Sequence, residues 1–132
     1  MVNIKIKKIF VLGCHRSGTT WLTNIISGVD QIYTPVSDLH HGQIESAFFS
    51  SIVPYFNNGR TSSDKIAMYA AYSRSDFYSC LGLEYYNFST DTMPYEFFSK
   101  SMDLATKNHE CDTWIEKTPA HSLVVDELYK RF

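Results

Sequence analysis

The stretch Ile9–Ile26, with the sequence IFVLGCHRSGTTWLTNII, decides the fold of this chain. A short apolar run comes first, a turn bracketed by Gly13 and Gly18 follows, and a helix-forming segment ends the stretch. Such a loop between a buried strand and a helix directs several backbone N–H groups and the positive end of the helix at one point. A phosphate group needs that arrangement, so the stretch predicts a phosphate-binding loop.

The loop has the glycine spacing of a P-loop, with one departure. Gly13 and Gly18 are separated by four residues and followed by two threonines. A nucleotide triphosphatase has a lysine directly after the second glycine. Here Thr19 occupies that position, and the cation is Arg16, two residues before the glycine. Because the cradle is kept while the lysine for the β- and γ-phosphates is missing, we predict a nucleotide without a triphosphate tail.

Two short segments resemble the motifs of one known family. Residues 16–21, RSGTTW, are similar to the 5′-phosphosulfate loop of sulfotransferases that use 3′-phosphoadenosine 5′-phosphosulfate (PAPS), and we place this loop at residues 13–21. Residues 114–121, WIEKTPAH, resemble the Glu-Lys-Thr-Pro segment of the carbohydrate- and bacterial-type branches of that superfamily. The resemblance implies a PAPS-dependent sulfotransferase that transfers a sulfuryl group to a hydroxyl or amine acceptor.

The resemblance also implies where the donor binds and what stabilises the transition state. The cofactor-binding residues would be those of the loop, namely Arg16, Ser17, Gly18, Thr19, Thr20 and Trp21. Lys117 resembles the family lysine that reaches the bridging oxygen and the sulfuryl group, and Arg16 would serve the 5′-phosphate as a second catalytic cation. The transferred group carries one negative charge, so these two side chains can replace the magnesium of phosphoryl transfer, and we expect no metal.

Two of these residues also have simpler interpretations. Trp21 is apolar and belongs to the predicted inward face of its helix, together with Leu22, Ile25 and Ile26, so it either packs in the core or stacks on the adenine. Lys117, taken alone, is also compatible with a solvated lysine at the end of a strand.

The general base is the least defined part of the predicted site. Carbohydrate-type members of the family have a glutamate shortly after the first helix, but this chain has no glutamate before Glu45. Asp38, His40 or His41 could accept a proton from a hydroxyl group, and histidine has the more suitable ordinary pKa. By position we choose Asp38 first and His41 second, with a polar loop or a helix N-cap at Asp38 as the alternative.

The pattern of apolar residues alternates between strand and helix. It predicts a strand over residues 8–13, a helix over 18–27, a second strand over 113–117 and a last helix that begins at Pro119. Such alternation indicates an α/β fold with a three-layer parallel sheet flanked by helices. The resemblance narrows this to the P-loop NTPase-like sulfotransferase fold. We expect both strands to be parallel in one sheet, which brings Arg16 and Lys117 to one edge.

The middle of the chain is predicted to be helical and is rich in aromatic residues. A capping arrangement at Thr61 predicts a helix to about Cys80, and Pro94 suits the first turn of another helix, to about Lys107. The aromatic residues are Tyr69, Tyr72, Phe77, Tyr78, Tyr85, Tyr86, Phe88, Tyr95, Phe97 and Phe98. In the family this interval contributes to the acceptor pocket, but aromatic residues at helical spacing usually pack in the core. The acceptor, whether a small molecule, a carbohydrate or a lipid, is not specified by them.

The length of 132 residues allows a single domain with a modest core. Residues 1–132 resemble only the N-terminal part of a sulfotransferase domain, apparently truncated, because the family's arginine and serine for the 3′-phosphate follow the second motif. After His121 only Ser122, Lys130 and Arg131 remain as candidates. We therefore expect this chain alone to bind adenosine 3′,5′-bisphosphate weakly and to show little transfer from PAPS.

Composition limits the partners that we expect. A net charge of −2 gives no electrostatic reason to expect nucleic acid, and no segment reaches the length of a membrane span. The three cysteines are odd in number and lack paired spacing, which favours reduced thiols in a cytoplasmic protein. No oligomeric state is predicted.

Two alternatives to an active sulfotransferase are kept. The first is a P-loop kinase or another P-loop nucleotide-binding protein, against which the missing lysine and the lack of a second magnesium carboxylate argue. A preference for ATP with magnesium over the bisphosphate would favour it. The second is a non-catalytic sulfotransferase remnant that lacks the 3′-phosphate half.

Overall fold

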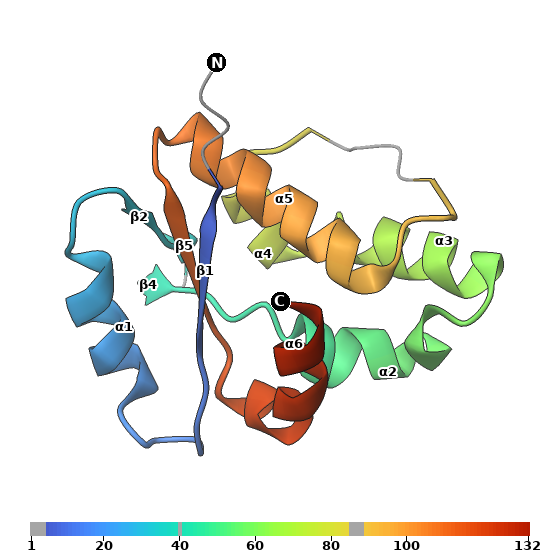
Figure 1. Ribbon diagram of the computed structural model, residues 1–132, viewed down its shortest axis with the longest axis horizontal. Coiled ribbons are helices and arrows are strands. Elements are labelled where there is room, and N and C mark those ends of the chain that lie inside the picture. The colour runs from blue at the N-terminus through green and yellow to red at the C-terminus, as the bar shows by residue number, and fades with distance from the viewer. Residues whose placement is uncertain (1–4, 40, 85–88) are drawn as a thin grey trace.

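The computed structural model describes residues 5–39, 41–84 and 89–132. Its main sheet has three strands in the order β1-β5-β2 (Figure 1). A separate two-stranded sheet pairs β3 with β4. The strands are β1 (Lys7–Val11), β2 (Ile32–Tyr33), β3 (Val36–Ser37), β4 (Gly42–Gln43) and β5 (Thr113–Lys117).

The main sheet is parallel throughout. β1 and β5 are parallel neighbours, with Phe10 opposite Glu116 and Val11 opposite Lys117, and β2 pairs in parallel with the first two residues of β5. The expected parallel arrangement of the two motif-bearing strands is therefore confirmed. Because both strands run in one direction, the loop after Val11 and the side chain of Lys117 lie at the same edge of the sheet.

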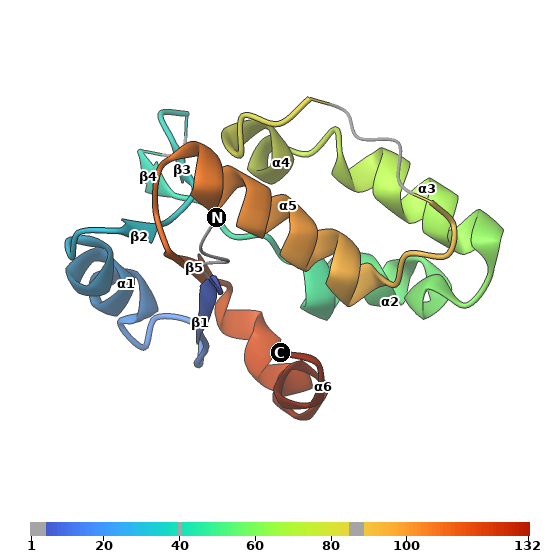
Figure 2. The same cartoon turned by 45° about the horizontal axis from the view of Figure 1, so that its top comes forward.

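Helices cover both faces of this sheet. They are α1 (Thr19–Ser27), a π-helical turn (Phe48–Ile52), α2 (Val53–Tyr55), a 3₁₀ turn (Asn57–Gly59), α3 (Ser62–Tyr72), α4 (Asp76–Cys80), α5 (Pro94–Asn108), a 3₁₀ helix (Pro119–Val124) and α6 (Val125–Arg131). α1 lies on one side of the sheet, while α3, α4 and α5 lie on the other (Figure 2). The fold is thus three-layered α/β, as expected.

Local capping determines where the middle helices begin. Thr61 and Asp64 form a capping box at the start of α3, and Pro94 occupies the first turn of α5. The prediction of a single helix up to Cys80 is wrong. The helix α3 ends at Tyr72, and Ser75 caps a separate helix, α4. The hydroxyl of Ser75 accepts a hydrogen bond from the Tyr78 backbone N–H, which offers the backbone an alternative to continuing α3.

The buried face of α1 differs from the prediction. Trp21 is 69% exposed, and Leu22 and Ile25 are also exposed, whereas Thr19 and Thr23 are buried against the sheet. The two threonines are four residues apart and therefore share one face of the helix. Their small side chains let α1 approach the sheet closely, and the Thr23 hydroxyl is satisfied by the Thr19 carbonyl at 2.8 Å. Amphipathic spacing identified the helix but not the face that it buries.

The hydrophobic core lies between the sheet and helices α3, α4 and α5. Its aromatic members are Tyr33, Phe48, Tyr69, Tyr72, Phe77, Tyr78, Phe97, Phe98 and Trp114. Most of the aromatic residues of the middle segment are therefore core residues; Tyr95 is half-buried, and Tyr85, Tyr86 and Phe88 lie outside the described residues.

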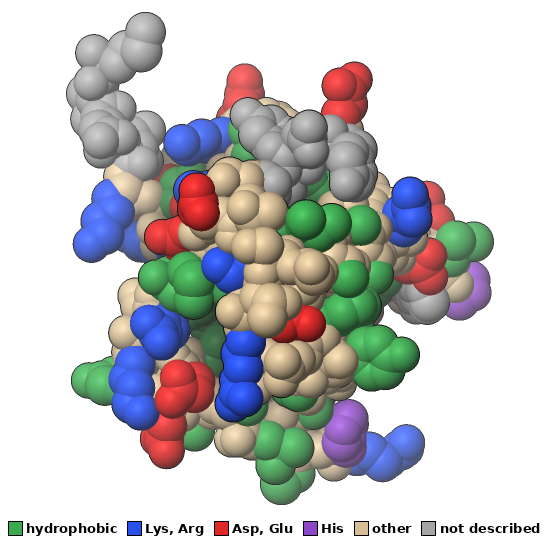
Figure 3. Space-filling view, turned by 90° about the vertical axis from the view of Figure 1, so that its right-hand side faces the viewer, with side chains coloured by type: hydrophobic (Ala, Val, Ile, Leu, Met, Phe, Trp, Pro, Cys, Tyr) green, Lys and Arg blue, Asp and Glu red, His purple; other side chains and the backbone are tan. Residues whose placement is uncertain are grey.

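The surface is mixed in character. Hydrophobic, basic and acidic side chains are interspersed on the face seen in Figure 3, in keeping with the small net charge of −2. Across the described ranges, no helix combines the length and the apolar character that crossing a bilayer requires.

Candidate active site

The loop between β1 and α1 presents an open helix N-terminus. Gly18 is the N-cap of α1 with a φ of 86°, a left-handed conformation that glycine adopts without steric cost. Among the described residues, no side chain caps the helix, and its first turn contains no acidic residue. The first backbone N–H groups of α1 are therefore available to an anion, which the helix dipole also favours.

Gly13 allows the loop to fold closely over itself. A Cβ atom at this position would lie 2.8 Å from the Ser17 Oγ and 3.2 Å from the Thr19 Cγ2. The Ser17 backbone N–H also donates to the Cys14 carbonyl at 3.2 Å, which closes the turn. A larger residue at Gly13 would therefore require the Ser17 hydroxyl to move and would crowd the Thr19 methyl group.

The loop exposes its cation. Arg16 has a φ of 64° and lies in an exposed turn, and within the described ranges its guanidinium makes no ion pair. A cation without a protein counter-charge beside an open helix N-terminus is a favourable place for an anionic group.

Lys117, the last residue of β5, carries the second predicted cation. Its side chain is only 6% exposed, and its Nζ lies 2.7 Å from the Oε1 of Glu45, whose side chain is 40% exposed. The backbone N–H of Gly13 donates to the Pro119 carbonyl at 3.4 Å, so the loop between β1 and α1 is linked directly to the segment after Lys117. The two predicted motifs are therefore adjacent in the structure.

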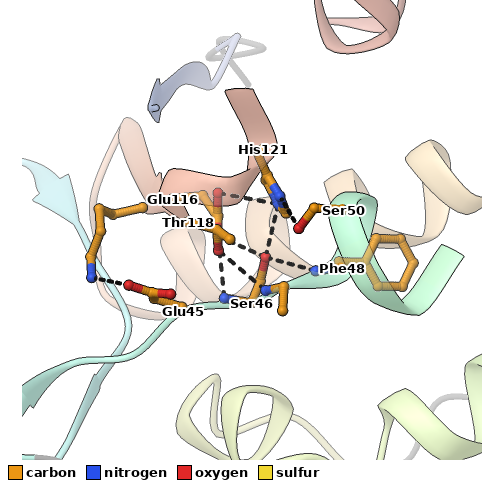
Figure 4. Close-up of polar contacts among 9 residues, drawn as sticks. Glu45, Ser46, Phe48, Ser50, Glu116, Thr118 and His121 are labelled. Atoms are coloured by element: carbon orange, nitrogen blue, oxygen red, sulfur yellow. Dashed lines mark hydrogen bonds and ion pairs between the residues drawn. The ribbon is translucent and has the colours of Figure 1, made fainter. Parts of the chain in front are cut away.

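Residues 45–47 belong to no helix or strand and lie against the end of β5 (Figure 4). Each of these three residues contacts a different residue at the end of β5 or directly after it. The three contacts join Lys117 to Glu45, Glu116 to Ser46 and Thr118 to Ala47. Glu116 Oε1 accepts from the Ser46 backbone N–H at 3.2 Å and from its hydroxyl at 2.7 Å. The Thr118 hydroxyl accepts from the Ala47 backbone N–H at 3.2 Å.

The comparison with known families agrees with this geometry. Residues 8–132 match the family model described as Sulfotransferase family, which covers both motifs and everything between them. The chain belongs to the sulfotransferase family. No curated protein matches the sequence. No solved structure matches it either.

Behind Lys117, this sulfotransferase-family chain has a buried polar cluster (Figure 4). Glu116 is 1% exposed; burial raises its pKa, while hydrogen bonds from Ser46 and Thr118 oppose that change. His121 Nε2 lies 3.6 Å from Glu116 Oε2, and its Nδ1 lies 3.0 Å from the Ser50 hydroxyl. Burial lowers the pKa of His121 to about 4, so the imidazole is neutral at pH 7 and the Glu116–His121 contact is not a full ion pair.

The residues chosen as general base lie elsewhere in the fold. Asp38 and His41 belong to the turn between β3 and β4, where the His41 backbone N–H donates to the Asp38 carbonyl at 3.3 Å. In the described part of the chain, neither side chain forms a hydrogen bond or ion pair with Lys117. His40 lies outside the described residues.

The carboxylate that contacts Lys117 is that of Glu45, which the prediction of the general base from sequence position did not choose. The sequence signal that could have found it is that Glu45 is the first glutamate of the chain. The β3–β4 hairpin separates Glu45 from the first helix, and the chain after this hairpin then reaches the end of β5. In the described residues, no group of three or more His, Cys, Asp or Glu side chains is arranged to hold a metal ion.

Proposed function

We propose that this family member uses PAPS as its donor and transfers the sulfuryl group to a hydroxyl or amine acceptor. The observation that carries the proposal is the junction of the two motifs: the open N-terminus of α1 and the Lys117–Glu45 pair lie at one edge of a parallel sheet. A site with anion-binding groups, a cation and an adjacent carboxylate has the parts that sulfuryl transfer requires.

The loop at residues 13–21 supplies the donor site in this proposal. Backbone N–H groups of residues 18–20 and the side chain of Arg16 bind the 5′-phosphosulfate, because within the described ranges no side-chain cap or acidic residue competes for the start of α1. Trp21 is 69% exposed, so its ring is free of the core and open to stacking by the adenine.

Lys117 and Glu45 divide the chemistry between them. The bond between sulfur and the bridging oxygen of PAPS breaks, and the Lys117 ammonium donates to that oxygen as it becomes negative. A new bond forms between sulfur and the acceptor oxygen or nitrogen, and Glu45 accepts the proton that this atom loses. The products are the sulfated acceptor and adenosine 3′,5′-bisphosphate. We place Glu45 ahead of Asp38 and His41 as the base because it contacts Lys117.

The acceptor class remains that of the family, a small molecule, a carbohydrate or a lipid. We infer a cytoplasmic location from the three cysteines, which are free thiols in the structure. Free thiols are typical of a reducing compartment.

A radiolabelled-donor assay tests the proposal. Purified protein is incubated with ³⁵S-labelled PAPS and a panel of phenols, sugars and lipids, and labelled products are identified by mass spectrometry. We expect transfer at a low rate to at least one class and loss of that transfer in Lys117→Ala, with Cys14→Ala as the loop control. Binding of ATP with magnesium in preference to the bisphosphate would contradict the proposal in favour of a P-loop kinase. Bisphosphate binding without transfer would favour a non-catalytic remnant.

A further inference from the structure

We propose that the buried Glu116 is a positioning residue, which fixes residues 45–47 on the end of β5 and so holds the Glu45 carboxylate on Lys117. The inference rests on the proposed function, because it concerns the pair to which that function assigns the chemistry. Glu116 itself is 1% exposed, so its carboxyl group is buried in the fold.

The first support is the backbone of the 45–47 segment. The backbone N–H groups of Ser46 and Ala47 are both taken by side chains at the end of β5, namely Glu116 and Thr118. Loop backbone usually bonds to other backbone groups or to water. Here the strand end itself sets the path of the loop.

The second support is the geometry of successive residues. Glu116 and Lys117 are adjacent in a strand, so their side chains point to opposite faces of the sheet. Glu45 and Ser46 are also adjacent, and each contacts one of the two. The hydrogen bonds between Ser46 and Glu116 therefore fix the backbone next to Glu45. This limits the positions that the Glu45 carboxylate can take on the other side of β5.

The third support is the cost of the arrangement. A carboxyl group in the core loses its hydration, and a residue such as leucine would fill the same space without that loss. Only one of the two Glu116 oxygens has hydrogen-bond partners among the described residues, while Oε2 faces the His121 ring at 3.6 Å. Burial of the Glu116 carboxyl costs free energy, so core stability does not explain why a glutamate lies here. Its bond to the Ser46 backbone indicates instead that it holds the 45–47 segment in place.

The main test uses Ser46→Ala, which removes the 2.7 Å hydroxyl bond to Glu116 and the weaker hydroxyl contacts to His121 Nε2 and the Phe48 N–H, both at 3.3 Å, but leaves the backbone bond to Glu116. We expect kcat to fall about tenfold, since small misplacements of catalytic groups reduce rates strongly, with the KM for PAPS changed less than twofold. Ser101→Ala is the matched control: both serines are 4% exposed, and among the described residues the Ser101 hydroxyl donates to the Phe97 carbonyl within α5. A similar fall of kcat in both variants would overturn the inference.

Substitutions at Glu116 test the same point from the other partner. Glu116→Gln keeps an oxygen that accepts from Ser46, so we expect it to retain most of kcat. Glu116→Ala should lose at least as much as Ser46→Ala. If Glu116→Ala does not fold, Ser46→Ala and Thr118→Val, which removes the acceptor for Ala47, decide the question alone.

A second readout does not depend on transfer. Lys117 is acylated with a limiting amount of an amine-reactive ester, and the labelled peptides are quantified by mass spectrometry. Freed from Glu45, Lys117 should label severalfold faster in Ser46→Ala, while the exposed Lys130 serves as internal reference. In a Glu45→Gln background the Ser46→Ala effect should disappear, because coupled residues are non-additive. Unchanged labelling, or an effect that persists in that background, would contradict the inference.

The two readouts separate the inference from the function on which it rests. Wild-type protein that transfers no sulfuryl group to any acceptor contradicts the proposed function, and the labelling experiment still decides whether Glu116 positions Glu45. Wild-type transfer with labelling that Ser46→Ala does not change leaves the function standing and removes the positioning role.

Discussion

The Nζ of Lys117 lies 2.7 Å from the Oε1 of Glu45, 72 residues earlier in the chain. This pair joins the end of β5 to the segment that follows the β3–β4 hairpin, at the same sheet edge as the loop between β1 and α1. A buried ammonium without a partner would be costly, so the pair also explains how Lys117 can be only 6% exposed. Four predictions follow from the site and the cluster behind it.

Glu45→Gln should reduce kcat by about 100-fold or more while leaving affinity for the bisphosphate within about threefold, because general base catalysis contributes about that much to the rate. Asp38→Asn and His41→Asn are the controls, and both should remain near wild type. Steady-state assays with titration calorimetry measure the two quantities. A larger loss of kcat in Asp38→Asn than in Glu45→Gln would return the role of base to Asp38.

Arg16→Ala should weaken binding of adenosine 3′,5′-bisphosphate by roughly tenfold or more, since charged hydrogen bonds contribute about 1.5–3 kcal/mol. The loss should shrink as salt concentration rises, because the side chain is exposed. His15→Ala, the neighbouring exposed substitution, is the control for loop perturbation. Calorimetry at two salt concentrations checks this, and equal losses in both variants would mean that Arg16 is not the binding cation.

Trp21→Ala should change the free energy of unfolding by less than about 0.5 kcal/mol, because its side chain is 69% exposed. It should nevertheless weaken nucleotide binding by roughly tenfold if the ring stacks on adenine. Trp114→Ala offers the contrast: Trp114 is fully buried, and its loss should destabilise the fold by about 3–5 kcal/mol. Urea denaturation and calorimetry measure both effects, and unchanged nucleotide affinity in Trp21→Ala would exclude the stacking role.

The stability of the protein should fall as the pH is lowered from about 6.5 to about 4, through His121. The folded-state pKa of His121 is lowered to about 4 by burial, against an ordinary value of 6.5, so in this range the unfolded state binds more protons. The full loss is on the order of 3 kcal/mol. Urea denaturation at several pH values measures it. In the part of the chain that the structure describes, the polar groups that contact the ring are Glu116, Ser46 and Ser50.

The controls for this pH dependence separate the two titrating groups. His121→Gln should lose the decline. Glu116→Gln, in which the facing carboxyl cannot titrate, should keep it. Burial raises the pKa of Glu116, so that group alone would make stability fall as pH rises above its ordinary value. A decline that persists in His121→Gln would assign the acid sensitivity to other groups.

Only part of the site was predictable from sequence, because some of its features depend on neighbouring residues and others on contacts between distant segments. The phosphate loop depends on neighbouring residues: Gly18 supplies the left-handed turn, and the helix begins at the next residue. The strands β1 and β5 were recognisable from short apolar runs, and their parallel pairing follows from strand–helix alternation. The face of α1 was predicted wrongly because close approach to the sheet favours the small Thr19 and Thr23 over its large apolar residues.

The amino-acid sequence by itself determined the α/β class, the loop that begins after β1 and the strand that ends at Lys117, since each is encoded within about ten consecutive residues. Only the tertiary structure decided that Glu45 contacts Lys117 and that Glu116 lies buried against Ser46. Those contacts join segments about 70 residues apart, and they depend on how the β3–β4 hairpin returns the chain to the end of β5. A local sequence pattern does not specify the path of the chain between two distant segments. The contacts between such segments are therefore known only from the tertiary structure.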